Sequence, residues 1–229
     1  MAEFRLRIAY RKADRLRFLS HLEVVRTLER GVRRAGLAYA VTAGFNPRMK
    51  AAFGPALPVG TASRKEYLDL WLTRYTAPEE AIRRIAVALP PELGPVEGAY
   101  VAERARALTA GEMLADYEVR VDTEGIARER IAEAVDSLVE AGSLTIEHKG
   151  KTKVFDLSQA LPNEPRVEVA KDGTVSVMLT VRIGPRGSLR PDVFVTAALT
   201  AADAPARVES VTRTGMVLLG EDDSRARPI

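Results

Sequence analysis

The sequence contains no cysteine among its 229 residues and only two histidines, His21 and His148. The lack of cysteine excludes disulfides, thiolate catalysis, zinc knuckles and any iron–sulfur cluster held by this chain. The two histidines are far apart in the sequence, and neither lies in a ligand-spaced group of acidic residues. Metal catalysis is therefore poorly supported, and no metal or other cofactor is expected.

Long hydrophobic runs are also missing. No stretch of about 18 apolar residues occurs, and the first residues, MAEFRLRIAYRK, lack the hydrophobic centre of a secretion signal. Apolar residues make up 46% of the chain and charged residues 28%, which is typical of a folded globular protein. We expect a cytoplasmic protein without a membrane partner.

The net charge of +3 hides an asymmetry along the chain. Residues 1–107 contain 19 Lys and Arg against 11 Asp and Glu, whereas the remaining residues contain 15 against 20. Most of the positive excess precedes residue 51, so the basic field is concentrated where a polyanion could bind. This favours RNA or another phosphate-bearing partner. The alternative is that the excess arginine only aids solubility.

A capped helix is predicted from Ser20 to Gly36. Ser20 and Glu23 have the spacing of a reciprocal helix cap, and glycine at position 36 is a typical helix end. Apolar residues recur at helical spacing, while Arg26 and Arg30 lie off the apolar stripe. Such arginines can either bind phosphate or form a solvated face.

His21 occupies the first position of that helix, where backbone N–H groups and the helix dipole favour an anion. The alternative is that it merely packs at the helix start. The following stretch 43–50, AGFNPRMK, combines turn-forming residues with Phe45, Arg48 and Lys50, a mixture of ring and cations that suits a nucleic-acid strand. The aromatic residue could equally anchor a long loop to the core.

A second phosphate-binding turn is possible at residues 184–192, GPRGSLRPD, where Arg186 and Arg190 precede a predicted helix. It has neither Walker nor dinucleotide spacing and could be a simple connection. The candidate RNA- or phosphate-binding residues are Arg17, Ser20, Arg26, Arg30, Gly44, Phe45, Asn46, Arg48, Lys50, Arg186 and Arg190, and the candidate catalytic residue is His21.

The pattern of elements predicts an α+β protein made of two tandem ferredoxin-like (β-α-β-β-α-β) units, the second with a hairpin insertion. The first unit is expected to span residues 1–107, the second 108–220, and 221–229 to form a flexible tail. The first unit is expected to have strands at 3–10, 37–41, 65–74 and 93–103 and helices at 20–36 and 78–89. Alternation in its first strand places Arg5 and Arg7 on the wetter face. The second unit is expected to have strands at 115–121, 166–170, 174–183 and 207–219, helices at 123–141 and 191–199, and an inserted hairpin at 144–157. The Asp-Gly pair at 172–173 predicts a tight turn between the strands at 166–170 and 174–183.

Several motifs, in this order and spacing, resemble a known family: Phe18-Leu19-Ser20-His21-Leu22, Gly44-Phe45-Asn46-Pro47, Leu57-Pro58-Val59-Gly60, and Ser63 through Glu66-Tyr67-Leu68-Asp69. The resemblance is to a bacterial radical-SAM-associated domain of unknown function, found alone or fused behind a cobalamin-type radical-SAM domain. It implies a setting in RNA metabolism or modification and a radical-SAM enzyme as partner. The family usually has His-Pro where this chain has Arg48-Met49, so no role of that second histidine is carried over.

Three functional hypotheses follow. The leading one is an RNA-binding or substrate-presenting accessory protein that works with a radical-SAM enzyme and is not an enzyme on its own. The second is a metal-independent endoribonuclease in which His21 acts as general base or acid. The third is a protein-interaction adaptor that does not bind nucleic acid.

Overall fold

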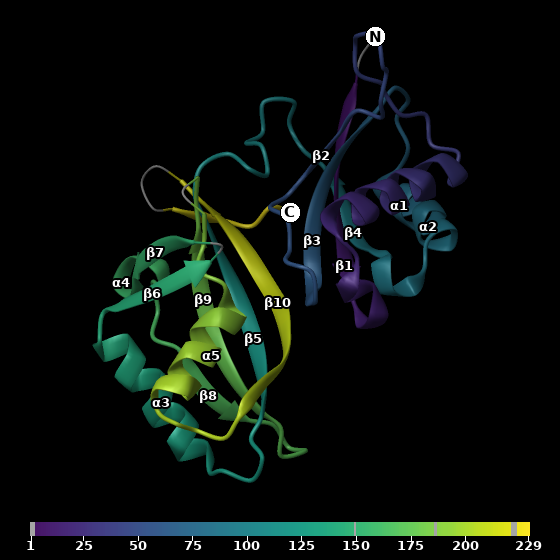
Figure 1. The fold of residues 1–229 in the computed structure, drawn as a ribbon. Helices are drawn as coiled ribbons and strands as arrows, with labels where there is room; N and C mark the ends of the chain where they lie inside the picture. Colours follow the sequence, from purple (N-terminus) through teal and green to yellow (C-terminus); the bar gives the residue numbers. More distant parts are fainter. Residues whose placement is uncertain (1–2, 149, 186, 221–223) are drawn as a thin grey trace. The chain divides into compact units, whose positions relative to one another are not determined.

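The computed structural model describes residues 3–148, 150–185, 187–220 and 224–229. The fold is α+β, as predicted, and the chain divides into two compact units (Figure 1). Unit 1 comprises residues 1–110 together with 227–229, and unit 2 comprises residues 111–226. Among the described helices, none is long and apolar enough to span a bilayer.

Unit 1 has the β-α-β-β-α-β order expected from the sequence. Its sheet has the order β4-β1-β3-β2, and each neighbouring pair is antiparallel. The elements are β1 (Phe4–Lys12), η1 (Asp14–Phe18), α1 (His21–Arg34), β2 (Ala51–Phe53), β3 (Thr61–Leu72), α2 (Pro78–Ala88), η2 (Pro91–Leu93) and β4 (Pro95–Tyr100).

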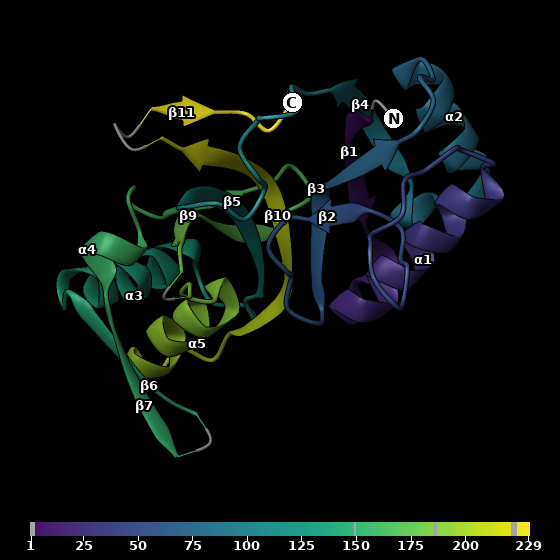
Figure 2. The same ribbon diagram turned by 90° about the horizontal axis from the view of Figure 1, so that it is seen from above.

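Helices α1 and α2 pack against each other on one face of this sheet (Figures 1 and 2). Alternate residues of β1 and β3, among them Leu6 and Leu70, are fully buried in the core under the helices. The α1 side of this core contains Val24, Leu28 and Val32. The stripe expected from the sequence contained Leu22 in place of Val24, but Leu22 is 63% exposed, so the stripe was only partly correct. Arg26 and Arg30 lie on the exposed face, as expected.

The outer edge of β3 differs from the prediction. The strand expected at 37–41 forms only isolated bridges, and β2 begins ten residues later, at Ala51. Both segments hydrogen-bond to β3, since the N–H of Ala40 donates to the Trp71 carbonyl and the N–H of Trp71 donates to the Lys50 carbonyl. Residues 41–49, here called the finger, leave the sheet between these two bonds, so the edge position is divided between two short segments.

A buried ion-pair cluster lies on the sheet face opposite α1 and α2. The alternation of β1 predicted that Arg5 and Arg7 would face solvent, but only 7% and 3% of their surfaces are exposed. Both guanidinium groups bind the fully buried Asp69 carboxylate: Arg5 Nη2 lies 2.6 Å from Oδ2, and Arg7 Nε lies 2.7 Å from Oδ1. The prediction was wrong because β3 carries a carboxylate on the same face as the two arginines.

The remaining guanidinium N–H groups of this cluster bind backbone carbonyls. Arg5 Nη1 donates to the carbonyl of Ala105 at 2.6 Å, and Arg7 donates to the carbonyls of Arg106 at 2.9 Å and Pro228 at 3.1 Å. One carboxylate and two arginines thus hold both the segment after β4 and the end of the chain to the unit 1 sheet.

Unit 2 repeats the same order of main elements. Its sheet has the order β10-β5-β9-β8, again antiparallel, and the predicted hairpin insertion is present as a separate two-stranded sheet, β6-β7 (Figure 1). The elements are β5 (Met113–Asp122), α3 (Arg128–Glu140), β6 (Ser143–His148), β7 (Lys151–Asp156), α4 (Leu157–Ala160), β8 (Arg166–Val169), β9 (Val175–Ile183), α5 (Pro191–Ala201), β10 (Arg207–Leu219) and β11 (Arg225–Ala226).

Two boundaries in unit 2 differ from expectation. Helix α3 begins at Arg128 rather than near residue 123, because Glu124 and Gly125 have φ angles of 48° and 90° and form a left-handed turn first. The segment 221–229 was expected to be a flexible tail, but β11 pairs with the end of β10 and the Pro228 carbonyl accepts a buried hydrogen bond. Residues 221–223 of that segment lie outside the described residues.

Replacing Asp69 tests how much unit 1 depends on the buried cluster. Asp69→Asn leaves two buried guanidinium groups without a counter-charge, so we expect a loss of about 3–5 kcal/mol in the free energy of unfolding, measured by urea denaturation. Asp122→Asn is the matched control, since Asp122 pairs with Arg207 at 2.8 Å but is 39% exposed. It is expected to cost far less because water solvates both groups. Equal losses would contradict a special role for the buried cluster.

Candidate nucleic-acid interface

The N-terminus of α1 carries the predicted reciprocal cap. The backbone N–H and the hydroxyl of Ser20 donate to the Glu23 carboxylate at 2.8 and 2.7 Å, and the N–H of Glu23 donates to Ser20 Oγ at 3.4 Å. These bonds from Ser20 lower the pKa of Glu23, and Arg26 adds a smaller lowering. A carboxylate of the chain itself therefore occupies the place where phosphate binding was expected, which leaves the arginines as the groups open to an anion.

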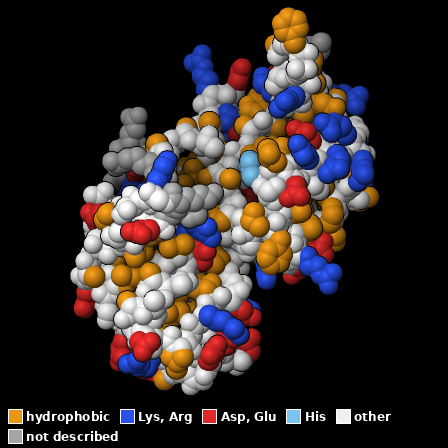
Figure 3. All heavy atoms as spheres, viewed as in Figure 1, with side chains coloured by type: hydrophobic (Ala, Val, Ile, Leu, Met, Phe, Trp, Pro, Cys, Tyr) orange, Lys and Arg blue, Asp and Glu red, His pale blue; other side chains and the backbone are white. Residues whose placement is uncertain are grey.

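Arg26 and Arg30 lie on the exposed face of α1, one helical turn and about 6 Å of rise apart. Neither guanidinium group lies in an ion pair with any carboxylate that the structure describes, whereas Arg33, on the next turn, pairs with Glu29 at 3.2 Å. Figure 3 shows Lys and Arg side chains gathered over the part of unit 1 where Figure 1 draws α1. We call Arg26 and Arg30 the open arginines.

The turn before α1 places a cation against an exposed ring. The guanidinium group of Arg17 lies 4.9 Å from the centre of the Phe18 ring, and 58% of Phe18 is exposed. The N–H of Gly60 donates to the Arg17 carbonyl at 2.9 Å and holds this turn against the loop that precedes β3. Arg17 and Phe18 are therefore fixed next to the start of α1, and Phe18 offers its ring to a partner.

The finger exposes some of the residues that the sequence predicted to bind RNA or phosphate. Gly44 has a φ of 117°, which only glycine adopts readily, and the next residue, Phe45, is completely exposed. Asn46 and Arg48 are also exposed. Lys50 is different, because its ammonium group lies 2.6 Å from the Glu3 carboxylate and 5.4 Å from the centre of the Trp71 ring. Lys50 is thus neutralised at the base of the finger rather than presented with Arg48.

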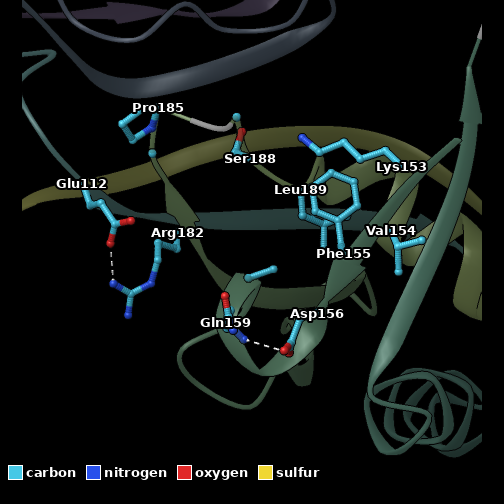
Figure 4. A pocket seen from close by; sticks show the side chains of 13 residues that line it. Glu112, Lys153, Val154, Phe155, Asp156, Gln159, Arg182, Pro185, Ser188 and Leu189 are labelled. Atoms are coloured by element: carbon cyan, nitrogen blue, oxygen red, sulfur yellow. Dashed lines mark hydrogen bonds and ion pairs between the residues drawn. The ribbon is translucent and has the colours of Figure 1, made fainter. Parts of the chain in front are cut away.

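The turn predicted to bind phosphate in unit 2 has compensated charges. Arg190 makes two bonds to the Asp192 carboxylate, at 3.1 and 2.5 Å, and Arg186 lies outside the described residues. A cavity of about 300 Å³ adjoins this turn (Figure 4). Among the cations that line it, Arg182 is paired with Glu112 at 2.8 Å, and the Lys153 ammonium lies 4.4 Å from the centre of the Phe155 ring. The described part of this turn therefore has less uncompensated positive charge for an anion than α1 has.

His21 is half-buried and meets the ring of Phe53 edge to face, with 6.0 Å between ring centres. It also lines a cavity of only about 10 Å³, roughly the space of one water molecule, together with Lys12 and Glu66. Lys12 and Glu66 are 2% and 3% exposed. Sequence reasoning missed both, although charged residues at inward positions of β1 and β3 were the available signal. Burial lowers the pKa of Lys12, and Glu66 partly opposes that shift.

Metal chemistry at this cluster has no support in the geometry. Within the described ranges, no three His, Asp or Glu side chains come together in a way that could hold a metal ion. The groups available around His21 are an ammonium, a carboxylate and a phenol, Tyr10, all of which transfer protons without a metal.

Comparison with models of protein families shows which family the chain belongs to. A family model described as an uncharacterized protein conserved in bacteria, DUF2344, matches residues 5–191. The chain belongs to this family. No curated protein matches the sequence significantly.

Solved structures give a likeness of fold alone. A chain of a Cbf5-Nop10-Gar1 complex superposes with a TM-score of 0.51 at 12% identity, over 92% of this chain and 48% of that chain. A chain of an archaeal box H/ACA sRNP Nop10-Cbf5 complex superposes with a TM-score of 0.45 at 12% identity, over 91% of this chain and 46% of that one. The DUF2344 chain thus spans about half the length of these two solved chains.

The buried lysine gives stability a measurable dependence on pH. Because the folded protein disfavours the Lys12 ammonium, the unfolded chain binds more protons between the lowered pKa and the ordinary value of 10.5, and stability gains with rising pH in that window. We expect Lys12→Met to lose this gain relative to the parent in urea unfolding at neutral and alkaline pH. Lys65→Met, at a lysine 40% exposed, is the control and should retain it. Parallel curves for parent and Lys12→Met would contradict the prediction.

Proposed function

We propose that this DUF2344 protein binds single-stranded RNA along α1 and the turn before it, as an accessory protein that presents the RNA to an enzyme. The observation that carries the proposal is the pair of open arginines, Arg26 and Arg30, on an exposed helix face. Arg207 and Arg190, by contrast, are already paired with carboxylates. A phosphate that reaches the open arginines displaces no carboxylate and releases counterions from the RNA.

Two exposed rings, one just before α1 and one on the finger, support single-stranded rather than double-stranded RNA. Phe18, with Arg17 against its face, and Phe45 at the finger offer flat surfaces to unpaired bases. Stacking of a base on an aromatic ring tolerates any base sequence, since every base has a π face. The proposed interface therefore binds RNA through charge and stacking, with little dependence on base identity.

The enzyme in this proposal is a radical-SAM protein, as the resemblance in the sequence implies. The DUF2344 chain has no cysteine, so an iron–sulfur cluster would have to be held by that partner. A likeness of fold to a chain from a Cbf5-Nop10-Gar1 complex is compatible with work inside a larger assembly, and it carries no more than that.

Removal of the open arginines tests the proposal. We expect Arg26→Ala/Arg30→Ala to weaken binding of a short unstructured oligoribonucleotide about 25-fold near 0.1 M salt and to make the log–log salt slope shallower by about 1.4. The measurement is fluorescence anisotropy over a series of salt concentrations. Arg128→Ala/Arg130→Ala is the matched control, because it removes two exposed arginines from α3 with the same change in net charge.

Two outcomes contradict the proposal. If the parent does not bind RNA at low salt, or binds it with no salt dependence, charge-driven recognition is wrong. If the α1 and α3 variants lose the same affinity, net charge rather than this surface is responsible. A different pair of results would favour the adaptor function. In that case the parent does not bind RNA, and Arg26→Ala/Arg30→Ala binds a radical-SAM protein as tightly as the parent does.

Metal-independent RNA cleavage is the second candidate, favoured by the meeting of His21, Lys12 and Glu66 at one small cavity. The cavity holds about one water, so a phosphate reaches these groups only if the loop 54–57 moves. If the chain cleaves RNA through this cluster, His21→Ala is expected to lose about 10²–10⁴-fold in rate while binding of RNA is kept. Cleavage at the parental rate by His21→Ala, assayed on end-labelled RNA, would remove this candidate.

A further inference from the structure

A second aromatic site lies at the base of the finger, on the side of unit 1 where β1 begins and β3 and β4 end. It is a pocket of about 290 Å³, near the lower limit for small-molecule sites. Its lining combines four aromatic rings with two cations and two carboxylates. The aromatic members are Phe4, Trp71, Tyr75 and Tyr100, and the charged members are Glu3, Arg5, Lys50 and Glu103.

The tyrosines form a fixed stack with one open member. Tyr75 and Tyr100 are stacked with ring centres 5.1 Å apart, and Phe4 meets both rings edge to face at 5.7 and 6.1 Å. The Tyr100 hydroxyl donates to the Thr76 carbonyl at 2.7 Å and accepts from the Thr76 N–H, which fixes the ring that supports the stack. Tyr75 is nevertheless 58% exposed, so much of its surface is accessible to a further flat ring.

The charges around the pocket disfavour an ionic ligand. The Trp71 ring already has Arg5 at 5.2 Å and Lys50 at 5.4 Å from its centre, and these cations are themselves held by the carboxylates of Asp69 and Glu3. A cationic ligand would be repelled by the two cations that already occupy Trp71, and an anion would have to compete with their carboxylate partners. The two cations and two carboxylates of the lining balance, so a neutral flat ring fits best.

We propose that this pocket binds one unpaired nucleobase of an RNA strand, stacked on Tyr75 and next to Trp71. The inference rests on the proposed function and adds to it a base-binding subsite that neither charge nor motif indicated. The backbone bond from Trp71 to Lys50 joins the pocket to the finger, whose exposed Arg48 is positioned to meet the adjoining phosphates. The strand would then be held by Arg48 on the finger and by stacking in the pocket.

The single tryptophan of the chain provides the readout, because Trp71 alone emits on selective excitation. Adenosine 5′-monophosphate is the probe, and we expect it to quench Trp71 fluorescence in a saturable manner after correction for its own absorption. Ribose 5-phosphate, which lacks the base, should not quench. Tetramethylammonium should not quench either, although it would if the pocket were a cage for organic cations.

The critical variant is Tyr75→Ala, which should weaken the binding of adenosine 5′-monophosphate at least about fivefold. Tyr75→Phe keeps the ring and should bind as the parent does, which separates stacking from a general effect on folding. Val87→Ala on α2 is the control, since Val87 is 86% exposed and lies outside both the pocket and the proposed RNA interface. It should leave the quenching unchanged.

These outcomes separate the inference from the proposed function. If the subsite is correct, Arg26→Ala/Arg30→Ala loses RNA affinity but still shows quenching by the mononucleotide. Equal quenching by ribose 5-phosphate, quenching by tetramethylammonium alone, or unchanged quenching in Tyr75→Ala overturns the subsite even if RNA binding stands. Absence of RNA binding with quenching intact would instead overturn the α1 interface.

Discussion

The buried carboxylate of Asp69 is the constraint on which unit 1 depends. Two guanidinium groups from β1 neutralise it, and their other N–H groups hold the backbone after β4 and the end of the chain. Buried charges are tolerated only when they are paired and fully hydrogen-bonded, so these segments have little freedom to be placed elsewhere. The cluster thus assigns Arg5 and Arg7, two cations of the basic N-terminal segment, to a structural role rather than to ligand binding.

Once Arg5, Arg7 and Lys50 are assigned to carboxylates, the free positive charge is much narrower than the composition suggests. It includes the exposed face of α1 and the finger, where Arg26, Arg30 and Arg48 have no described ion-pair partner. The paired cations still affect the aromatic pocket. Arg5 and Lys50 lie against Trp71, and their charges balance those of the carboxylates in the pocket lining. The same side chains that stabilise unit 1 therefore underlie both proposals, a neutral ring in the pocket and phosphate at α1.

Local patterns predicted local structure well. The Ser20–Glu23 cap, the glycine after α1, the Asp-Gly hairpin between β8 and β9 and the inserted hairpin all depend on interactions within a few residues, and all are present. The prediction of a strand at 37–41 was wrong because an edge strand needs a long-range partner, and the segment 37–41 shares the edge of β3 with the later segment 51–53. Lys12 and Glu66 were missed because charged residues in strands are usually assumed to face water.

The sequence by itself determined the α+β class, the order of elements in both units, the capped basic helix and the absence of thiol chemistry. These follow from periodicity, turn residues and composition, which are properties of neighbouring residues or of the chain as a whole. Only the tertiary structure decided which cations are neutralised and which rings meet, because Arg5 and Asp69, or Tyr75 and Phe4, are more than sixty residues apart. Pairing over such distances depends on strand register, and no local pattern contains it.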